Sequence, residues 1–327
     1  MLLVTGGAGF IGSNLVAALS QRGDDVVVCD RLGTGDKWRN LAQHEIEDVI
    51  PPEELPQFLR WAEGGLSAVV HLGAISATTE SDADALLASN FRLSKVFWDH
   101  CAREEIPLVY ASSAATYGDG AEGFDDDPDR DRLARLRPLN GYGWSKHLFD
   151  RWVLRRVARG EAAPPQWVGL KFFNVYGPNE YHKGAQASVA WHLFGQLDRG
   201  EPAKLFRSHH PDYADGGQLR DFIWVGDCVD VMLWLLDNPA VSGLFNVGTG
   251  KARSFADLAR AVCAAMERPE NISYVPTPEA IRDRYQYFTE AKIARLRAAG
   301  YDRPFTELED GVTRYVRDFL TQANPYR

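Results

Sequence analysis

The sequence of 327 residues has little cysteine and no long run of apolar residues. Its four cysteines, Cys29, Cys101, Cys228 and Cys263, form no CxxC pair and no close-spaced pattern. We therefore expect reduced, mostly buried thiols and no disulfide framework. No apolar run approaches the roughly 18 residues of a membrane span. The N-terminus lacks a basic stretch before its apolar residues, so no signal peptide is expected and the expected location is cytoplasmic.

Positive charge is also scarce. Lys and Arg number 36 against 45 Asp and Glu, which gives a net charge of −9, and the pI is about 5.4. This balance argues against nucleic acid or an anionic membrane as a partner, although a small phosphorylated ligand needs only local cations. Hydrophobic residues at 45% and charged residues at 25% are typical of a folded globular protein. The length suggests about two domains.

Short β-rich runs alternate with helical patterns in the first half of the chain. The expected strands are residues 2–5, 26–29, 68–72, 108–112 and 167–173, and the expected helices between them include 13–21, 84–104 and 142–158. Strands separated by helices imply a parallel sheet that is covered on both faces. The fold class predicted is therefore α/β, with a Rossmann-type doubly wound parallel sheet.

The alternation loosens in the second half, where helical patterns at 184–197, 227–236, 255–266 and 290–299 are joined by longer connections. We predict a dinucleotide-binding Rossmann domain over residues 1–173 and a smaller C-terminal α/β substrate domain over 174–327. Part of the latter, near 221–250, can return to the first domain. The charged stretch 125–137 is predicted to be a solvated surface loop.

A glycine motif lies between the first expected strand and helix. Gly7, Gly9 and Gly12 follow the GxGxxG spacing, and Asp30 lies 18 residues after Gly12, at the end of the second expected strand. In this context the glycines allow a tight turn and close approach of a pyrophosphate, and the acid can bind the adenosine ribose. Arg31 is a candidate partner of a 2′-phosphate, or else a surface residue.

A second motif is Tyr142-x-x-x-Lys146, whose spacing puts both side chains on one face of a helix. A phenol of pKa about 10 is a poor base at pH 7, but a neighbouring ammonium group stabilises its phenolate. Tyr142 can then take a hydroxyl proton. This motif is common by chance, and it gains weight from the glycine motif and from Ser113, which ends the preceding strand and can bind the reacting oxygen.

Together these motifs resemble the extended short-chain dehydrogenase/reductase family. The matching segments are TGGAGFIG at 5–12, HLGA at 71–74, Asn90, SSAATYG at 112–118, Tyr142 with Lys146, FNVYGP at 173–178 and RDFIWVGD at 220–227. The resemblance covers essentially the whole chain and implies a nucleotide-linked sugar as substrate. Dehydratases of the family usually have an Asp-Glu pair where this chain has residues 114–116, so epimerases and reductases remain.

Within that family the chain resembles the branch that epimerises C6″ of ADP-glycero-manno-heptose, a precursor of the lipopolysaccharide core. NVYGPNEYHKGAQASVAWHL at 174–193, RYQYFT at 284–289 and LRAAGYDRPF at 296–305 carry this resemblance. It implies transient oxidation to a ketone by a tightly bound cofactor, with two bases, Tyr142 and Lys183, on opposite sides of the carbon. Lys183 must then be neutral, so burial or a neighbouring cation should lower its pKa.

The resemblance also assigns the remaining site residues. Ser113 and Lys146 complete the catalytic set. Cofactor binding is expected from Gly6, Gly9, Phe10, Ile11, Gly12, Asp30, Arg31, Lys37, Leu72, Gly73, Ala74, Ile75, Ser76, Asn90, Lys146, Val175 and Lys183, and substrate binding from Ser113, Asn174, Ala185, His192, Phe206, Arg220 and Tyr285. We expect NADP, with NAD as the alternative, an ADP-heptose substrate, a homo-oligomer and no metal.

The chain departs from the branch at several places. Leu72 replaces an acidic residue, Ala185 replaces a serine, and Pro51-Pro52 occupies a segment that often holds a cation. The loop 207–219 is longer than usual and carries two His and two Asp residues, for which metal binding is the less favoured interpretation. The alternatives are a UDP-sugar 4-epimerase, another NAD(P)-dependent nucleotide-sugar epimerase or reductase, and a dinucleotide-binding protein without catalysis.

Overall fold

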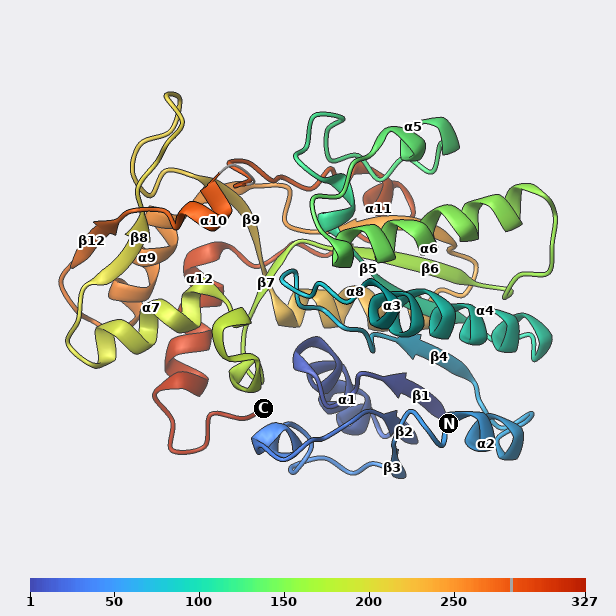
Figure 1. Ribbon diagram of the computed structural model, residues 1–327. Coiled ribbons are helices and arrows are strands. Elements are labelled where there is room, and N and C mark those ends of the chain that lie inside the picture. Colours follow the sequence, from blue (N-terminus) through green and yellow to red (C-terminus); the bar gives the residue numbers. More distant parts are fainter. Residues whose placement is uncertain (283–284) are drawn as a thin grey trace.

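The computed structural model describes residues 1–282 and 285–327. A parallel seven-stranded sheet forms its larger part (Figure 1). In spatial order its strands are β10 (Gly243–Val247), β6 (Trp167–Phe172), β5 (Leu108–Ser113), β4 (Ala68–His71), β1 (Leu2–Thr5), β2 (Val26–Cys29) and β3 (Asp48–Ile50). The expected Rossmann-type parallel sheet is confirmed. Strand β10 pairs with β6 and so returns to this sheet from the second half of the chain.

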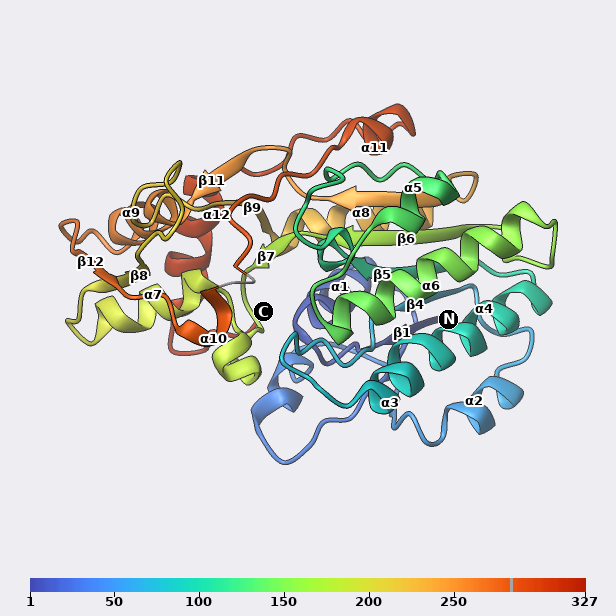
Figure 2. The ribbon, with the colours of Figure 1, turned by 45° about the horizontal axis from the view of Figure 1, so that its top comes forward.

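Helices cover both faces of the sheet, as the two views show (Figures 1 and 2). On one face α1 (Phe10–Arg22) and α8 (Val225–Asp237) pack in one apolar core. On the other face α2 (Leu55–Trp61), α4 (Leu93–Arg103) and α6 (Gly141–Ala158) form a second core, which is rich in aromatic rings. Helix α4 continues from α3 (Ala83–Leu86) and a π-helical segment, η2 (Leu87–Arg92). Because both faces are buried, strands such as β1 (LLVT) and β2 (VVVC) are mostly apolar.

A smaller unit lies beside the carboxyl ends of these strands and has its own apolar core. It contains a three-stranded sheet of β11 (Ala252–Ser254), β9 (Leu219–Trp224) and β7 (Asn174–Tyr176), and the pair β8 (Ala203–Phe206) and β12 (Ile272–Val275). Its helices are α7 (Val189–Asp198), α9 (Phe255–Ala265), α10 (Glu279–Arg282) and α12 (Leu308–Tyr315). This unit supplies the second wall of the cavity described below.

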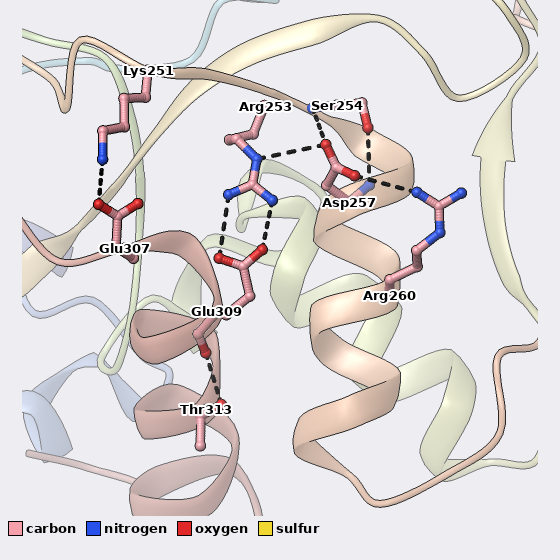
Figure 3. A network of polar contacts seen from close by, with 8 residues as sticks. All are labelled: Lys251, Arg253, Ser254, Asp257, Arg260, Glu307, Glu309 and Thr313. Atoms are coloured by element: carbon pink, nitrogen blue, oxygen red, sulfur yellow. Dashed lines mark hydrogen bonds and ion pairs between the residues drawn. The ribbon is translucent and has the colours of Figure 1, made fainter.

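Polar contacts join α9 and α12 at the surface of the smaller unit (Figure 3). Ser254 and Asp257 form a capping box at the start of α9. Arg253 makes two hydrogen bonds to Glu309 on α12 and lies 3.6 Å from Asp257. Lys251 pairs with Glu307 just before α12. These pairs are partly exposed, so each contributes little, and the apolar core beneath them holds the two helices together.

Several expected boundaries were wrong. The helix expected at 184–197 begins at Val189, where the Ser188 hydroxyl accepts a hydrogen bond from the Trp191 N–H. Gly184, at φ 54°, interrupts the short helical segment η4 (Tyr181–Gln186) that precedes it. The helix expected at 290–299 is only α11 (Ala294–Ala298).

The charged stretch 125–137 is not all solvated loop. It contains α5 (Arg130–Arg135), and the Asp126 carboxylate is buried, where it accepts a hydrogen bond from the Asn246 N–H. All four cysteines are free and buried, as expected. Among the described residues, no helix combines the length and the apolar character needed to cross a bilayer.

Candidate active site

A cavity of about 820 Å³ lies where the carboxyl ends of β1, β4, β5 and β6 face the smaller unit. Ligands of doubly wound sheets bind at this edge. All four residues predicted to be catalytic, Ser113, Tyr142, Lys146 and Lys183, line it. It is also lined by the predicted binding residues Gly6, Gly9, Phe10, Ile11, Gly12, Asp30, Lys37, Leu72, Gly73, Ala74, Ser76, Asn174, Val175 and Ala185. The structure therefore brings most of the predicted site together.

The turn between β1 and α1 depends on its glycines. Gly6 has a left-handed φ of 66°, and a Cβ on Gly12 would lie only 2.1 Å from the Gly6 carbonyl oxygen. Helix α1 begins at Phe10, and its first residues line the cavity. The N–H groups of this turn and the positive end of the helix dipole fit a pyrophosphate. The chain therefore has the cradle that a dinucleotide needs.

Asp30 follows β2 and is held in place by its neighbours. One carboxylate oxygen accepts a hydrogen bond from the Ala8 N–H at 3.0 Å, and the other accepts one from Lys37 Nζ at 2.6 Å. Lys37 lies on η1 (Asp36–Asn40) and faces the cavity. Arg31 does not line the cavity, because its exposed guanidinium pairs with Glu53. The cation placed beside Asp30 is thus Lys37, and not Arg31.

Asn90 and Ile75 lie behind the residues that line the cavity. The buried Asn90 accepts a hydrogen bond from the Ile75 N–H and donates one to the Ile75 carbonyl, each at 2.9 Å. Its amide also donates to the Ser145 hydroxyl on α6. Neither Asn90 nor Ile75 lines the cavity. Their contacts shape the loop that presents Leu72 and Ser76 to it.

Tyr142, Lys146 and Ser113 meet where β5 ends and α6 begins. The Asn140 side chain caps α6 by accepting a hydrogen bond from the Gly143 N–H at 2.8 Å. Lys146 is buried and donates to the Ala111 carbonyl at 2.8 Å. Burial lowers the pKa of Lys146 to about 8. Burial raises the pKa of Tyr142, and a hydrogen bond with Ser113 opposes this rise.

Lys183 reaches the same cavity from the smaller unit, on the short helix η4 (Tyr181–Gln186). Its Nζ lies 5.2 Å from the centre of the Phe10 ring. Burial lowers the pKa of Lys183, while the buried Glu180 carboxylate opposes that effect. Of the two causes expected from the sequence, burial therefore accounts for the shift. A lysine with a lowered pKa is suited to proton transfer.

Three predicted substrate residues form a cluster beside the cavity. The rings of Phe206 and Tyr285 are 6.3 Å apart, and the Arg220 guanidinium lies 5.4 Å from the Tyr285 ring centre. Arg220 also lies 5.6 Å from the ring of Phe255, which does line the cavity. His192 is not among the lining residues and packs against the Trp191 ring. Arg284, the first residue of the 284–289 stretch, lies outside the described residues.

The sequence left several lining residues without a role. Thr78, Thr79, His182, Ser188, Phe222, Phe255 and Leu258 all face the cavity. His182 and Ser188 belong to the 174–193 stretch that resembles the heptose branch, so a signal for them existed. Phe255 and Leu258 lie on α9 and carried no signal, because only the folding of the smaller unit brings this helix to the cavity.

The long loop 207–219 packs through aromatic rings. His210 lies 5.3 Å from the Tyr213 ring and 5.1 Å from that of Tyr287, and Asp215 accepts a hydrogen bond from the Ser208 N–H. Within the part of the chain that the structure describes, no three His, Cys, Asp or Glu side chains are grouped to hold a metal ion. The His210 ring thus packs against tyrosine rings, and His209 is exposed.

Comparison with known proteins places the chain among nucleotide-sugar enzymes. Residues 2–248 match the NAD dependent epimerase/dehydratase family. A relative from Nitratidesulfovibrio vulgaris (strain DP4), named ADP-L-glycero-D-manno-heptose-6-epimerase, is 51% identical over 329 aligned positions that cover 100% of both chains. A relative of the same name from Fusobacterium nucleatum subsp. nucleatum is 45% identical, again over 100% of both chains.

Two solved structures extend the likeness to the fold. ADP-L-glycero-D-manno-heptose-6-epimerase of Helicobacter pylori superposes with a TM-score of 0.79 at 26% identity, covering 97% of this chain and 95% of that one. UDP-glucose 4-epimerase of Thermus thermophilus, in complex with NAD, gives a TM-score of 0.75 at 27% identity, with 96% and 97% covered. The likeness spans nearly the whole chain.

Proposed function

Because this chain belongs to the NAD dependent epimerase/dehydratase family, we propose that it inverts C6″ of ADP-glycero-manno-heptose, from D-glycero to L-glycero. The observation that carries the proposal is that Tyr142 and Lys183 reach one cavity from different structural units. The hydroxyl groups of the two epimers point to different sides of C6″, and bases on two separate elements can each take or return the hydroxyl proton of one epimer. The choice of heptose rests on the names of relatives that match over their full length.

A bound nicotinamide cofactor supplies the reversible hydride transfer that converts the C6″ hydroxyl group into a carbonyl and back. The chain's own residues handle the protons. Tyr142, as phenolate, takes the hydroxyl proton of one epimer, and the Lys146 ammonium group stabilises the phenolate charge. Neutral Lys183 takes or returns the proton for the other epimer. Ser113 holds the reacting oxygen by a hydrogen bond.

NADP is the cofactor that we propose, with NAD as the alternative. Lys37 supports this choice, since its ammonium group lies beside Asp30 at the cavity wall, where a 2′-phosphate needs a cation. The segment of Pro51 and Pro52, which often holds a cation in the branch that the chain resembles, supplies no cation at these two positions. Acid denaturation of the purified protein, followed by mass measurement of the released nucleotide, is the test. Release of NAD alone would overturn the choice of NADP.

For the substrate, Arg220 is the proposed diphosphate contact, because a guanidinium group can bind phosphate oxygens in pairs. Phe206 and Tyr285 beside it offer ring surfaces to the nucleotide. Asn174 and Ala185, which line the cavity, and His192, which does not, remain proposed contacts to the substrate. A role in supplying heptose for the lipopolysaccharide core, a cytoplasmic location and a homo-oligomeric state belong to the same proposal.

A direct assay tests the reaction. The protein is incubated with ADP-D-glycero-D-manno-heptose, and the L-glycero epimer is sought by NMR. We expect conversion without added cofactor, since hydride returns to the carbon from which it came. No conversion by protein with confirmed bound cofactor would overturn the proposal. UDP-glucose serves as the parallel substrate, and turnover of UDP-glucose alone would favour the 4-epimerase alternative.

A further inference from the structure

A buried ion pair lies directly beneath the proposed catalytic centre. Asp150 and Lys171, 0% and 1% exposed, are 2.7 Å apart between α6 and β6. Asp150 follows Lys146 by one helical turn. Burying two charges is costly, and an apolar pair of similar volume is often at least as stable. A contribution to stability alone is therefore a weak reason for this pair.

The pair braces the end of β5 on both sides of Ser113. Asp150 accepts a hydrogen bond from the Ser112 hydroxyl at 2.7 Å. Lys171 donates to the Thr116 hydroxyl at 2.7 Å, and Thr116 in turn donates to the Ser113 carbonyl at 2.8 Å. The backbone on both sides of the Ser113 side chain is thus connected to one carboxylate.

The pair also sets the electrostatic surroundings of Lys146. On β4, His71 is kept neutral by burial, which lowers its pKa to about 3. On α6, burial lowers the pKa of His147 to about 4, so this side chain is neutral as well. Tyr110 on β5 donates to Asp150 at 3.2 Å, and burial keeps it protonated. The remaining charged groups of the network are Asp150 and Lys171, and the Asp150 charge raises the pKa of Lys146 against the effect of burial.

We propose that the Asp150–Lys171 pair is a positioning element of the catalytic centre, which holds Ser113 in place and keeps Lys146 in its ammonium form. The inference rests on the proposed function only for the roles of Ser113 and Lys146. Asp150 itself does not line the cavity. It acts on Ser113 through its hydrogen bond with Ser112, and on Lys146 through its negative charge.

The charge effect is tested without substrate. The ε-carbon signals of the eight lysines are followed by NMR against pH in protein labelled with ¹³C-lysine, and the Lys146 signal is identified with Lys146→Met. Removing the carboxylate charge in Asp150→Asn should lower the titration midpoint of Lys146 by about one pH unit. Asp227→Asn is the matched control, because Asp227 is a buried carboxylate on α8 that binds Thr306, outside this network. This control substitution should leave the titration midpoint of Lys146 unchanged.

If Asp150→Asn does not fold, the double variant Asp150→Asn, Lys171→Met leaves no unpaired charge, and a smaller fall in the same direction is expected. An unchanged Lys146 midpoint in a folded variant overturns the electrostatic role. Because no turnover is measured, this result is independent of whether ADP-heptose is the substrate.

The bracing of Ser113 is tested by Thr116→Val, which removes the link to the Ser113 carbonyl. We expect about a tenfold fall in kcat with KM and the Lys146 midpoint unchanged. Unchanged kcat in a variant that melts like the wild type overturns the bracing role. If the wild type itself turns over no ADP-heptose, the proposed function has failed and the NMR titration still decides the charge effect.

Discussion

Lys183, from the smaller unit, places its Nζ 5.2 Å from the ring centre of Phe10, the first residue of helix α1. This contact joins the glycine turn that is fit for a dinucleotide to the residue proposed as the second base. The Phe10 ring gives Lys183 an apolar neighbour, and burial lowers the pKa of Lys183. The contact therefore relates the position of the lysine to its chemistry.

Replacement of Lys183 tests the two-base mechanism. Lys183→Met keeps the length of the side chain and removes the amine, so turnover of ADP-heptose should fall at least about a hundredfold, as is usual on loss of a general base. NMR conversion rates measure the fall. Lys204→Met, on β8 outside the cavity lining, is the control and should be as active as the wild type. Undiminished turnover by Lys183→Met would contradict the assignment.

The pH dependence of turnover should follow Lys146. Its pKa is lowered from 10.5 to about 8, so the ammonium group is present below pH 8 and is lost as the pH rises through that value. Because the phenolate of Tyr142 needs this charge, kcat should decline above about pH 8. In Lys146→Arg, whose guanidinium does not lose its proton in this range, the remaining activity should show no such decline. If kcat of Lys146→Arg declined above about pH 8 as in the wild type, the Lys146 ammonium group would not be the cause of the decline.

The glycine turn should tolerate no side chain at position 12. In Gly12→Ala the new Cβ would meet the Gly6 carbonyl oxygen at 2.1 Å, so either α1 moves or the turn opens. We expect a loss of about 3 kcal/mol in the free energy of unfolding and loss of the bound nucleotide. Denaturant unfolding and the nucleotide absorbance measure the two effects.

Gly195→Ala is the control for that substitution, since Gly195 lies within α7 and its nearest neighbour is the end of the flexible Arg199 side chain. It should be neutral or stabilising by about 0.5 kcal/mol. Equal effects of the two substitutions would show that the turn is not the sensitive feature.

Buried His71 should make the protein sensitive to acid. Its ring is hydrogen-bonded to the Thr5 and Ser94 hydroxyls at 2.7 and 3.0 Å. Burial lowers the pKa of His71 from 6.5 to about 3, so between these values the unfolded chain binds the proton and the folded protein does not. The free energy of unfolding therefore falls as the pH falls through this window, by at most about 1.4 kcal/mol per pH unit from this group.

Urea unfolding at pH 6.5 and pH 5 measures that slope. His71→Gln should flatten it, whereas His209→Gln, on the exposed part of the 207–219 loop, should not. A slope that His71→Gln leaves unchanged would assign the acid sensitivity to other groups.

Those parts of the site whose residues are close along the chain follow from the sequence alone. The GxGxxG spacing specifies a strand, turn and helix, because a side chain at Gly12 has no space whatever surrounds the turn. The spacing of four between Tyr142 and Lys146 puts both on one face of α6, since the helical period requires it. The alternation of apolar strands and helices likewise predicts the parallel sheet that is found.

Which distant side chains meet follows only from the folded chain. The Lys37 ammonium group, and not the Arg31 guanidinium, lies beside the Asp30 carboxylate, because the Arg31 guanidinium pairs with Glu53 outside the cavity. Phe255 reaches the cavity because the smaller unit packs α9 against β9, a contact that no local spacing encodes. Asp150 and Lys171 are paired across helix and strand by burial. Such contacts depend on how elements far apart along the chain pack together, and that packing is a property of the whole chain.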